Sequence, residues 1–142
     1  MIEFDDNCWA VRRDKVILVQ ERGKQFLFDN SNARAVELTK VDGCKIKEGI
    51  RCDFMARFET GTQPFEYFIE LKGQNITHAL EQLLFTWLKL GFRGKHINTQ
   101  AFIVLSRSKN SATKNRKIKK EWRDKYKIEL IITNRRHTES IP

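Results

Sequence analysis

The stretch that decides the fold is RCDFMARFETGTQPFEYFIELK, residues 51–72. Its pattern predicts two strands, Ile50–Glu59 and Phe65–Gly73, with a turn between them. A two-residue turn at Gly61 and Thr62 would pair positions whose numbers sum to 123. This register separates an apolar face from a charged one, whereas a slip of one residue would mix the two faces. The sequence therefore predicts an antiparallel hairpin in this register.

In the predicted register, the apolar face pairs Cys52 with Leu71, Phe54 with Ile69, Ala56 with Tyr67, and Phe58 with Phe65. The other face pairs Arg51 with Lys72, Asp53 with Glu70, Met55 with Phe68, and Arg57 with Glu66. We interpret the last of these pairs as a solvated charge pair without a function.

The register sets the carboxylates of Asp53 and Glu70 opposite each other, with Lys72 two residues along on the same side. Opposed like charges destabilise a sheet by roughly 0.2–1 kcal/mol. A hard divalent cation such as Mg²⁺ offsets this repulsion, because it takes carboxylate oxygens and keeps several waters. A lysine beside such a metal can orient or deprotonate an attacking water. These residue types together predict phosphodiester hydrolysis.

Outside the hairpin, the clearest element is a helix over Ile76–Leu90, with Asn75 as its N-cap and Gly91 at its end. The other expected elements are a hairpin of Lys15–Glu21 and Gln25–Phe28, a strand over Val36–Ile46 (although its pattern is mixed), a strand buried on both faces at Ala101–Leu105, a helix over Ser111–Tyr126, a strand at Ile128–Thr133 and a polar tail, Asn134–Pro142. This order predicts one α/β domain, residues 1–142, with a central mixed sheet flanked by helices.

Composition sets the expected location. The chain has 142 residues, 27 Lys and Arg against 18 Asp and Glu, and a net charge of +9. No apolar run approaches the roughly 18 residues that span a bilayer. The first residues, MIEFDD, are acidic, whereas a leader peptide would be basic. We expect a cytoplasmic protein in a reducing environment, with no membrane partner.

The three cysteines, Cys8, Cys44 and Cys52, fit no zinc spacing, and their odd number argues against a disulfide framework. We expect Cys44 and Cys52 to be small buried apolar side chains.

The positive charge is concentrated in one window, 107–127, where ten Lys and Arg against two Asp and Glu give +8. A solvated helix surface is the alternative interpretation, but this excess is larger than solubility requires. We expect phosphate contacts from Lys114, Arg116, Lys117, Lys119, Lys120 and Arg123. Lysine suits contact with a nucleic-acid backbone rather than base readout. Trp122 and Tyr126 lie on the apolar seam of this helix and are expected in the core.

Asp53, followed after sixteen residues by Glu70-Leu71-Lys72, resembles the motif of PD-(D/E)XK nucleases, which include restriction endonucleases, archaeal Holliday junction resolvases and RecB-like exonucleases. The resemblance extends from Gly49 into the helix after Gly73. It implies a restriction endonuclease-like core in which Asp53 and Glu70 bind Mg²⁺ or Mn²⁺ and Lys72 assists the nucleophilic water.

Three further positions follow from this resemblance. Cys52 stands where many members have proline. Members often add a glutamate from a preceding helix as a ligand; Glu37 is our candidate, with Glu21 and Asp42 behind it. If residues 36–46 are all strand, Glu37 would not reach the metal. Gln82 resembles a glutamine that some exonuclease-like members place near the site, and we assign it to the catalytic group.

The sequence thus predicts a metal-dependent nuclease that acts on DNA rather than RNA. A homodimer is expected by analogy alone, since many relatives cut both strands as dimers. The rival hypothesis is a non-catalytic nucleic-acid-binding subunit that uses only the basic window 107–127.

Overall fold

The predicted hairpin forms in the predicted register. In the structure, a computed structural model that describes residues 2–71, 75–94, 96–106 and 112–142, strand β5 is Phe54–Glu59 and strand β6 is Pro64–Glu70. Their residues pair antiparallel from Phe54 with Ile69 to Glu59 with Pro64, and each pair sums to 123. The alternation of the two faces was therefore sufficient to fix this register.

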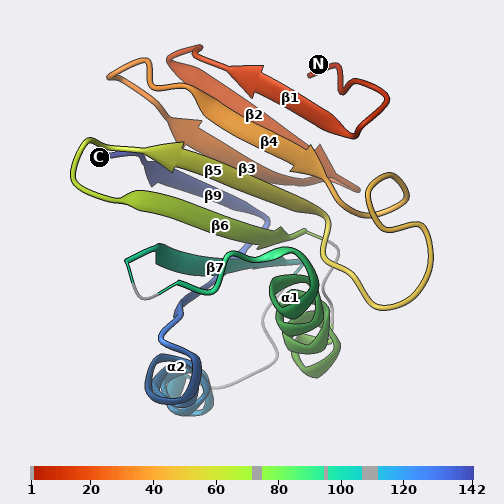
Figure 1. Ribbon diagram of the computed structural model, residues 1–142. Helices are drawn as coiled ribbons and strands as arrows, with labels where there is room; N and C mark the ends of the chain where they lie inside the picture. The colour runs from red at the N-terminus through yellow and green to blue at the C-terminus, as the bar shows by residue number, and fades with distance from the viewer. Residues whose placement is uncertain (1, 72–74, 95, 107–111) are drawn as a thin grey trace.

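The hairpin lies at the centre of a six-stranded mixed sheet with the order β1-β4-β5-β6-β7-β8. Figure 1 shows β1, β4, β5, β6 and β7 side by side in this order. The remaining strands of this sheet are β1 Trp9–Arg12, β4 Val36–Lys40, β7 Asn98–Leu105 and β8 Glu129–Asn134. Strands β1, β4, β5 and β6 pair antiparallel, and β6, β7 and β8 pair parallel. The parallel strands are connected through helices α1, Ile76–Leu90, and α2, Ala112–Tyr126. The prediction of one α/β domain with a mixed sheet is confirmed.

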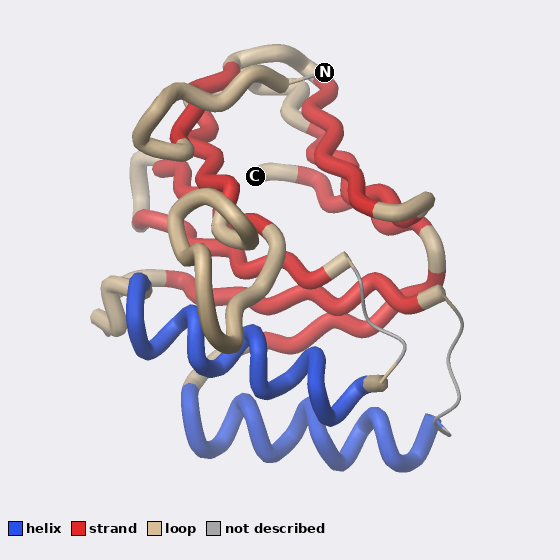
Figure 2. Tube along the Cα trace, turned by 90° about the vertical axis from the view of Figure 1, so that its right-hand side faces the viewer, coloured by secondary structure: helices blue, strands red, loops and turns tan. Residues whose placement is uncertain are grey.

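Both helices cover the same face of the large sheet (Figure 2). The opposite face packs on a second sheet with the order β2-β3-β9, formed by β2 Val16–Glu21, β3 Lys24–Asp29 and β9 Arg136–Ser140. We predicted helices on both faces of the sheet. The prediction is right for the face that α1 and α2 cover and wrong for the face that the small sheet covers. Alternating side chains such as Ile17, Phe26 and Phe28 of the small sheet bury the apolar face of the β5–β6 hairpin.

The polar tail predicted at Asn134–Pro142 is wrong. Strand β9 within it pairs parallel with β3. Ile141 is buried and donates its backbone N–H to the Asp29 carbonyl at 2.9 Å. The tail is ordered mainly by backbone hydrogen bonds to an open strand edge, which leave little trace in side-chain pattern.

The two predicted helices are confirmed, as far as the structure describes them. Asn75 caps α1 by accepting the His78 backbone N–H at 3.2 Å. Gly91 follows α1, and a Cβ there would lie 2.6 Å from the Trp87 carbonyl oxygen, so this close approach needs glycine. Trp122 of α2 is buried in the core, as expected.

The cysteine prediction is wrong for two of the three residues. Cys8 and Cys44 form a disulfide, although 36 residues separate them. They meet because β1 pairs with β4, which brings the start of β1 beside the turn that follows β4. Cys52 is free and buried, as predicted. Disulfides are rare in the reducing cytoplasm, so this bond counts against a reducing compartment.

Among the described residues, no helix has the length and hydropathy to cross a membrane.

Candidate functional site

Asp53 lies just before β5 begins and is held by two neighbouring segments, the end of β6 and the turn that follows β4. Its N–H donates to the Ile69 carbonyl at 3.1 Å, and its carbonyl accepts the N–H groups of Val41 at 2.9 Å and Asp42 at 3.3 Å. Its side-chain Oδ2 accepts the Leu71 N–H at 2.7 Å. Asp53 is 2% exposed. The carboxylate is therefore fixed against the end of β6.

The regular pairing of the hairpin ends one step earlier than predicted. Phe54 with Ile69 is the last pair, so the expected pairs of Asp53 with Glu70 and Cys52 with Leu71 lie outside the ladder. Cys52 packs among the residues on the helix side of the sheet, whereas Leu71 packs on the other side. The predicted apolar pair is wrong, because α1 takes the backbone N–H of Cys52.

Glu70 is the last residue of β6, pairs with Ile103 of β7 and is fully buried. Burial raises the pKa of the Cys52 thiol far above its ordinary value, and the negative charges of Glu70 and Asp53 raise it further, while the contact with Thr86 acts in the opposite sense. Asp53 is hydrogen-bonded to Ile69 and Leu71, the two residues that flank Glu70. The structure brings Asp53 and Glu70 together at the same edge of the sheet.

Two buried carboxylates constrain the local chemistry. Burying an ionised carboxylate costs several kcal/mol unless a positive charge lies close by. Lys72 follows Leu71 directly but lies outside the described residues. Within the described part of the chain, no group of three or more His, Cys, Asp or Glu gathers as a metal site. The protein ligands available here are thus a carboxylate pair, and Mg²⁺ commonly binds one or two carboxylates and completes its shell with water.

Helix α1 holds the segment in front of Asp53. Gln82 Nε2 donates to the Arg51 carbonyl at 3.0 Å. Thr86 Oγ1 accepts the Cys52 N–H at 2.8 Å and donates to the Gln82 carbonyl at 2.8 Å. Gln82 thus contacts the backbone two residues before Asp53. Sequence reasoning missed Thr86; its signal is a polar residue within the apolar stripe of α1, where it is fully buried.

The structure does not bring Glu37 to the carboxylate pair. Glu37 is exposed on β4 and lies opposite Arg57, four residues along from Asp53. Four residues of strand span roughly 13 Å. Of the two reserve candidates, Asp42 pairs with Arg51 at 2.7 Å, and Glu21 ends β2 in the other sheet.

The pair of Arg57 and Glu66 is not the solvated pair that we expected. Glu66 is fully buried, and its Oε2 lies 2.6 Å from Arg57 Nε. Arg57 also donates to the Leu90 carbonyl at 2.7 Å and lies 3.9 Å from the centre of the Phe92 ring. The prediction is wrong because the end of α1 folds over this part of the sheet. The pair attaches the helix to β5 and β6.

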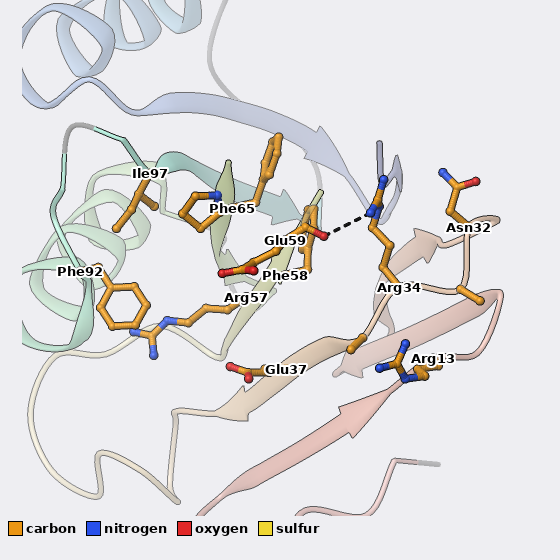
Figure 3. A pocket seen from close by; sticks show the side chains of 13 residues that line it. Arg13, Asn32, Arg34, Glu37, Arg57, Phe58, Glu59, Phe65, Phe92 and Ile97 are labelled. Carbon is orange, nitrogen blue, oxygen red and sulfur yellow. Dashed lines mark hydrogen bonds between the residues drawn. The ribbon is translucent and has the colours of Figure 1, made fainter. Parts of the chain in front are cut away.

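Glu37 and Arg57 line a hollow of about 600 Å³ at the far end of β5 (Figure 3). Figure 3 shows Arg57 beside the Phe92 ring and Arg34 bonded to the Glu59 backbone oxygen. Arg13 lies across the hollow from Phe92. Positive and negative groups are mixed here, and the hollow is separate from the carboxylate pair.

The predicted basic residues lie on α2. Those exposed to solvent are Lys114, Arg116, Lys117, Lys120 and Arg123. Lys119 is half-buried, and Ile118, Trp122 and Tyr126 turn toward the core. We call the six cationic residues the α2 basic face; Arg107 and Lys109 of the same window lie outside the described residues.

The α2 basic face begins at the same edge of the sheet as the carboxylate pair. Strands β6 and β7 are parallel, so both end at this edge, and α1 and α2 follow them in the chain. In open α/β sheets, ligands bind at the carboxyl ends of such strands. Neither helix has an acidic residue in its first turn, which favours anions near both N-termini.

A scan against protein-family models, a search of curated proteins and a search of solved structures each found no match for this chain.

Proposed function

We propose that the protein is a metal-dependent nuclease that hydrolyses phosphodiester bonds, in DNA rather than RNA, with Mg²⁺ or Mn²⁺ as its cofactor. The observation that carries this proposal is the pair of buried carboxylates, Asp53 and Glu70, where β6 ends. One or two carboxylates, with waters completing the shell, are a usual set of ligands for Mg²⁺.

The donor chemistry fits such an ion. Asp53 and Glu70 would hold the metal, which supplies charge stabilisation and an acidified water when bound. Leu71 fixes one oxygen of Asp53, and Gln82 and Thr86 hold the preceding backbone. Lys72 would orient the water or steady charge on the phosphate. Gln82 acts in this proposal through the backbone of Arg51 rather than on the substrate.

The order of elements supports a restriction endonuclease-like core. Antiparallel β5 and β6 carry Asp53 and Glu70, α1 follows, and β7 then pairs parallel with β6. This is the order that the resemblance to PD-(D/E)XK nucleases implies. By the same analogy, two copies would be needed to cut both strands of a duplex.

The α2 basic face would hold the substrate backbone. Its lysines suit sequence-independent contact with phosphates. Cations at the same edge of the sheet would also offset the repulsion between the acids and a polyanion.

The second candidate is a non-catalytic nucleic-acid-binding subunit that uses the α2 basic face alone. One observation favours it: the described residues contain no group of three or more His, Cys, Asp or Glu that could hold a metal. This candidate predicts DNA binding without cleavage.

Nicking of supercoiled plasmid in Mg²⁺ and in Mn²⁺ separates the two candidates. We expect Asp53→Asn and Lys72→Ala to lower the rate by about 100-fold or more, a usual size for the loss of a group that acts on the water. Glu59→Gln is the matched control, because Glu59 is an exposed carboxylate at the other end of β5. Wild-type protein that binds DNA and never nicks it would exclude the nuclease. If both site variants cut as fast as wild type, the site is elsewhere.

A further inference from the structure

The Cys8–Cys44 disulfide closes the turn that holds Asp53. Cys44 lies within this turn, residues 41–46, which we call the Val41–Ile46 turn. The turn is closed internally by the Ile46 N–H, which donates to the Val41 carbonyl at 2.9 Å. Cys8 is fixed to the strand before the turn, since its carbonyl accepts the Lys40 N–H at 2.9 Å. The disulfide thus joins the turn covalently to the start of β1.

The same turn contacts Asp53 directly. Two of its N–H groups, from Val41 and Asp42, converge on the Asp53 carbonyl at 2.9 and 3.3 Å. The Asp42 side chain also pairs with Arg51, two residues before Asp53. A displacement of the turn would therefore move the backbone that carries the Asp53 carboxylate.

We propose that the Cys8–Cys44 disulfide is a redox-sensitive tether, whose reduction loosens the Val41–Ile46 turn and weakens binding of a divalent cation by Asp53 and Glu70. The metal-binding half of this inference rests on the proposed function. The mechanical half, in which the bond orders the turn and Asp53, does not.

The redox step needs a dithiol as reductant. One of its thiolates attacks the sulfur of Cys44, which is the less buried of the two cysteines, and Cys8 leaves as a thiolate that takes up a proton. The second thiol of the reductant then closes its own disulfide and releases the Cys44 thiol. Two electrons pass from the reductant to the protein, and oxidation reverses the step.

Reduction is expected to loosen the turn without unfolding the domain. Ile46 stays packed in the helix-side core, and β1 remains paired with β4. The bond acts on a metal ligand through its backbone, and changes to such outer contacts typically alter metal affinity by about 10–100-fold. Exposed disulfides are more readily reduced than buried ones, and Cys44 keeps part of its surface exposed.

The test compares oxidised and dithiol-reduced wild-type protein after the reductant is removed without air. Amide exchange followed by NMR reports the turn, and a Mn²⁺ titration followed by electron paramagnetic resonance reports the metal. We expect the Val41 and Asp42 amides to exchange about 10-fold faster or more after reduction. The dissociation constant for Mn²⁺ should rise by about 10-fold.

The variant Cys8→Ser/Cys44→Ser is the matched control. It should behave like the reduced protein and should not respond to the dithiol; if it does not fold, recovery of both signals on reoxidation of the wild type replaces it. Unchanged exchange and unchanged Mn²⁺ affinity after reduction would overturn the tether. If the oxidised protein binds no Mn²⁺ while exchange still changes, the proposed function fails and the mechanical tether stands.

Discussion

The carboxylate of Asp53 accepts the backbone N–H of Leu71 at 2.7 Å, so a side chain at the start of β5 is bonded to the end of β6. This bond replaces a rung of the hairpin ladder beyond the pair of Phe54 and Ile69. One oxygen of Asp53 is thereby oriented by the backbone before any ligand arrives. Rigid support of this kind is what a precise metal or catalytic site requires.

Thr86→Val tests whether α1 positions Asp53. Valine keeps the volume and removes the hydroxyl, so the buried Cys52 N–H loses its acceptor, which costs about 1–3 kcal/mol of unfolding free energy. We expect faster exchange of the Cys52 amide and, under the proposed function, about 10-fold weaker Mn²⁺ binding. Amide exchange and metal titration measure the two effects.

Thr86→Ser is the control for that experiment. Serine keeps the hydroxyl and removes one buried methyl group, so it should cost about 1 kcal/mol of stability and leave the Cys52 amide protected. If the Cys52 amide stays as well protected in Thr86→Val as in Thr86→Ser, the hydrogen bond from Cys52 to Thr86 does not hold this segment.

Arg57→Met tests the buried ion pair. Because Glu66 has no exposed surface, removing Arg57 leaves a buried carboxylate that keeps the Phe92 N–H, at 3.2 Å, but loses its ion-pair partner. We expect a loss of about 3 kcal/mol in a urea titration, at the low end for such pairs because Arg57 keeps 28% of its side chain exposed. The double variant Arg57→Met/Glu66→Gln should recover part of the loss. A cost below about 1 kcal/mol for the single variant would match a surface pair instead.

The elements that could be predicted are those whose signal is local and regular. The β5–β6 register follows from strict alternation over residues 54–69, and α1 follows from its apolar stripe between Asn75 and Gly91. Asp53 and Glu70 were predictable as neighbours because two residues in a fixed register need no further information.

What could not be predicted depends on interactions between distant segments. The disulfide needs the pairing of β1 with β4, and β9 needs the open edge of β3. The ladder ends before Asp53 because the Cys52 N–H donates to Thr86 of α1, which is distant in the sequence. Glu66 is buried because the segment that follows α1 covers it, with the Phe92 N–H bonded to its carboxylate. None of these leaves a periodic pattern within its own segment.

Neutralising the α2 basic face tests the proposed interface. The triple variant Lys117→Gln/Lys119→Gln/Lys120→Gln should bind duplex DNA more weakly at low salt, because it removes three sites of counterion release. The slope of log affinity against log salt should become shallower by about 0.9 for each phosphate that the variant no longer neutralises. Fluorescence anisotropy across a salt series measures both the affinity and the slope.

The matched control removes three exposed positive charges that lie outside α2. Arg13→Gln/Lys15→Gln/Arg22→Gln alters residues in loops before and within the small sheet and lowers the net charge equally. Its salt slope should stay near that of the wild type. If both triple variants lose affinity alike, net charge alone drives binding, and α2 is not the interface.

The Cys52 thiol gives the protein an alkaline limit of stability that a variant can isolate. Burial and the neighbouring carboxylates raise the pKa of the folded-state thiol well above its ordinary value of 9.0. Stability from the neutral thiol is therefore complete below pH 9 and declines above it, because only the unfolded chain then releases the proton. The wild type should lose about 1 kcal/mol of unfolding free energy between about pH 9 and pH 10 that Cys52→Ala retains. Tyr67, whose pKa is also raised by burial, is common to both proteins and cancels in the difference. Urea titrations at each pH measure the unfolding free energy of the wild type and of Cys52→Ala. If the two proteins show the same pH dependence, the thiol ionises in the folded protein. That result would contradict its buried position beside two carboxylates.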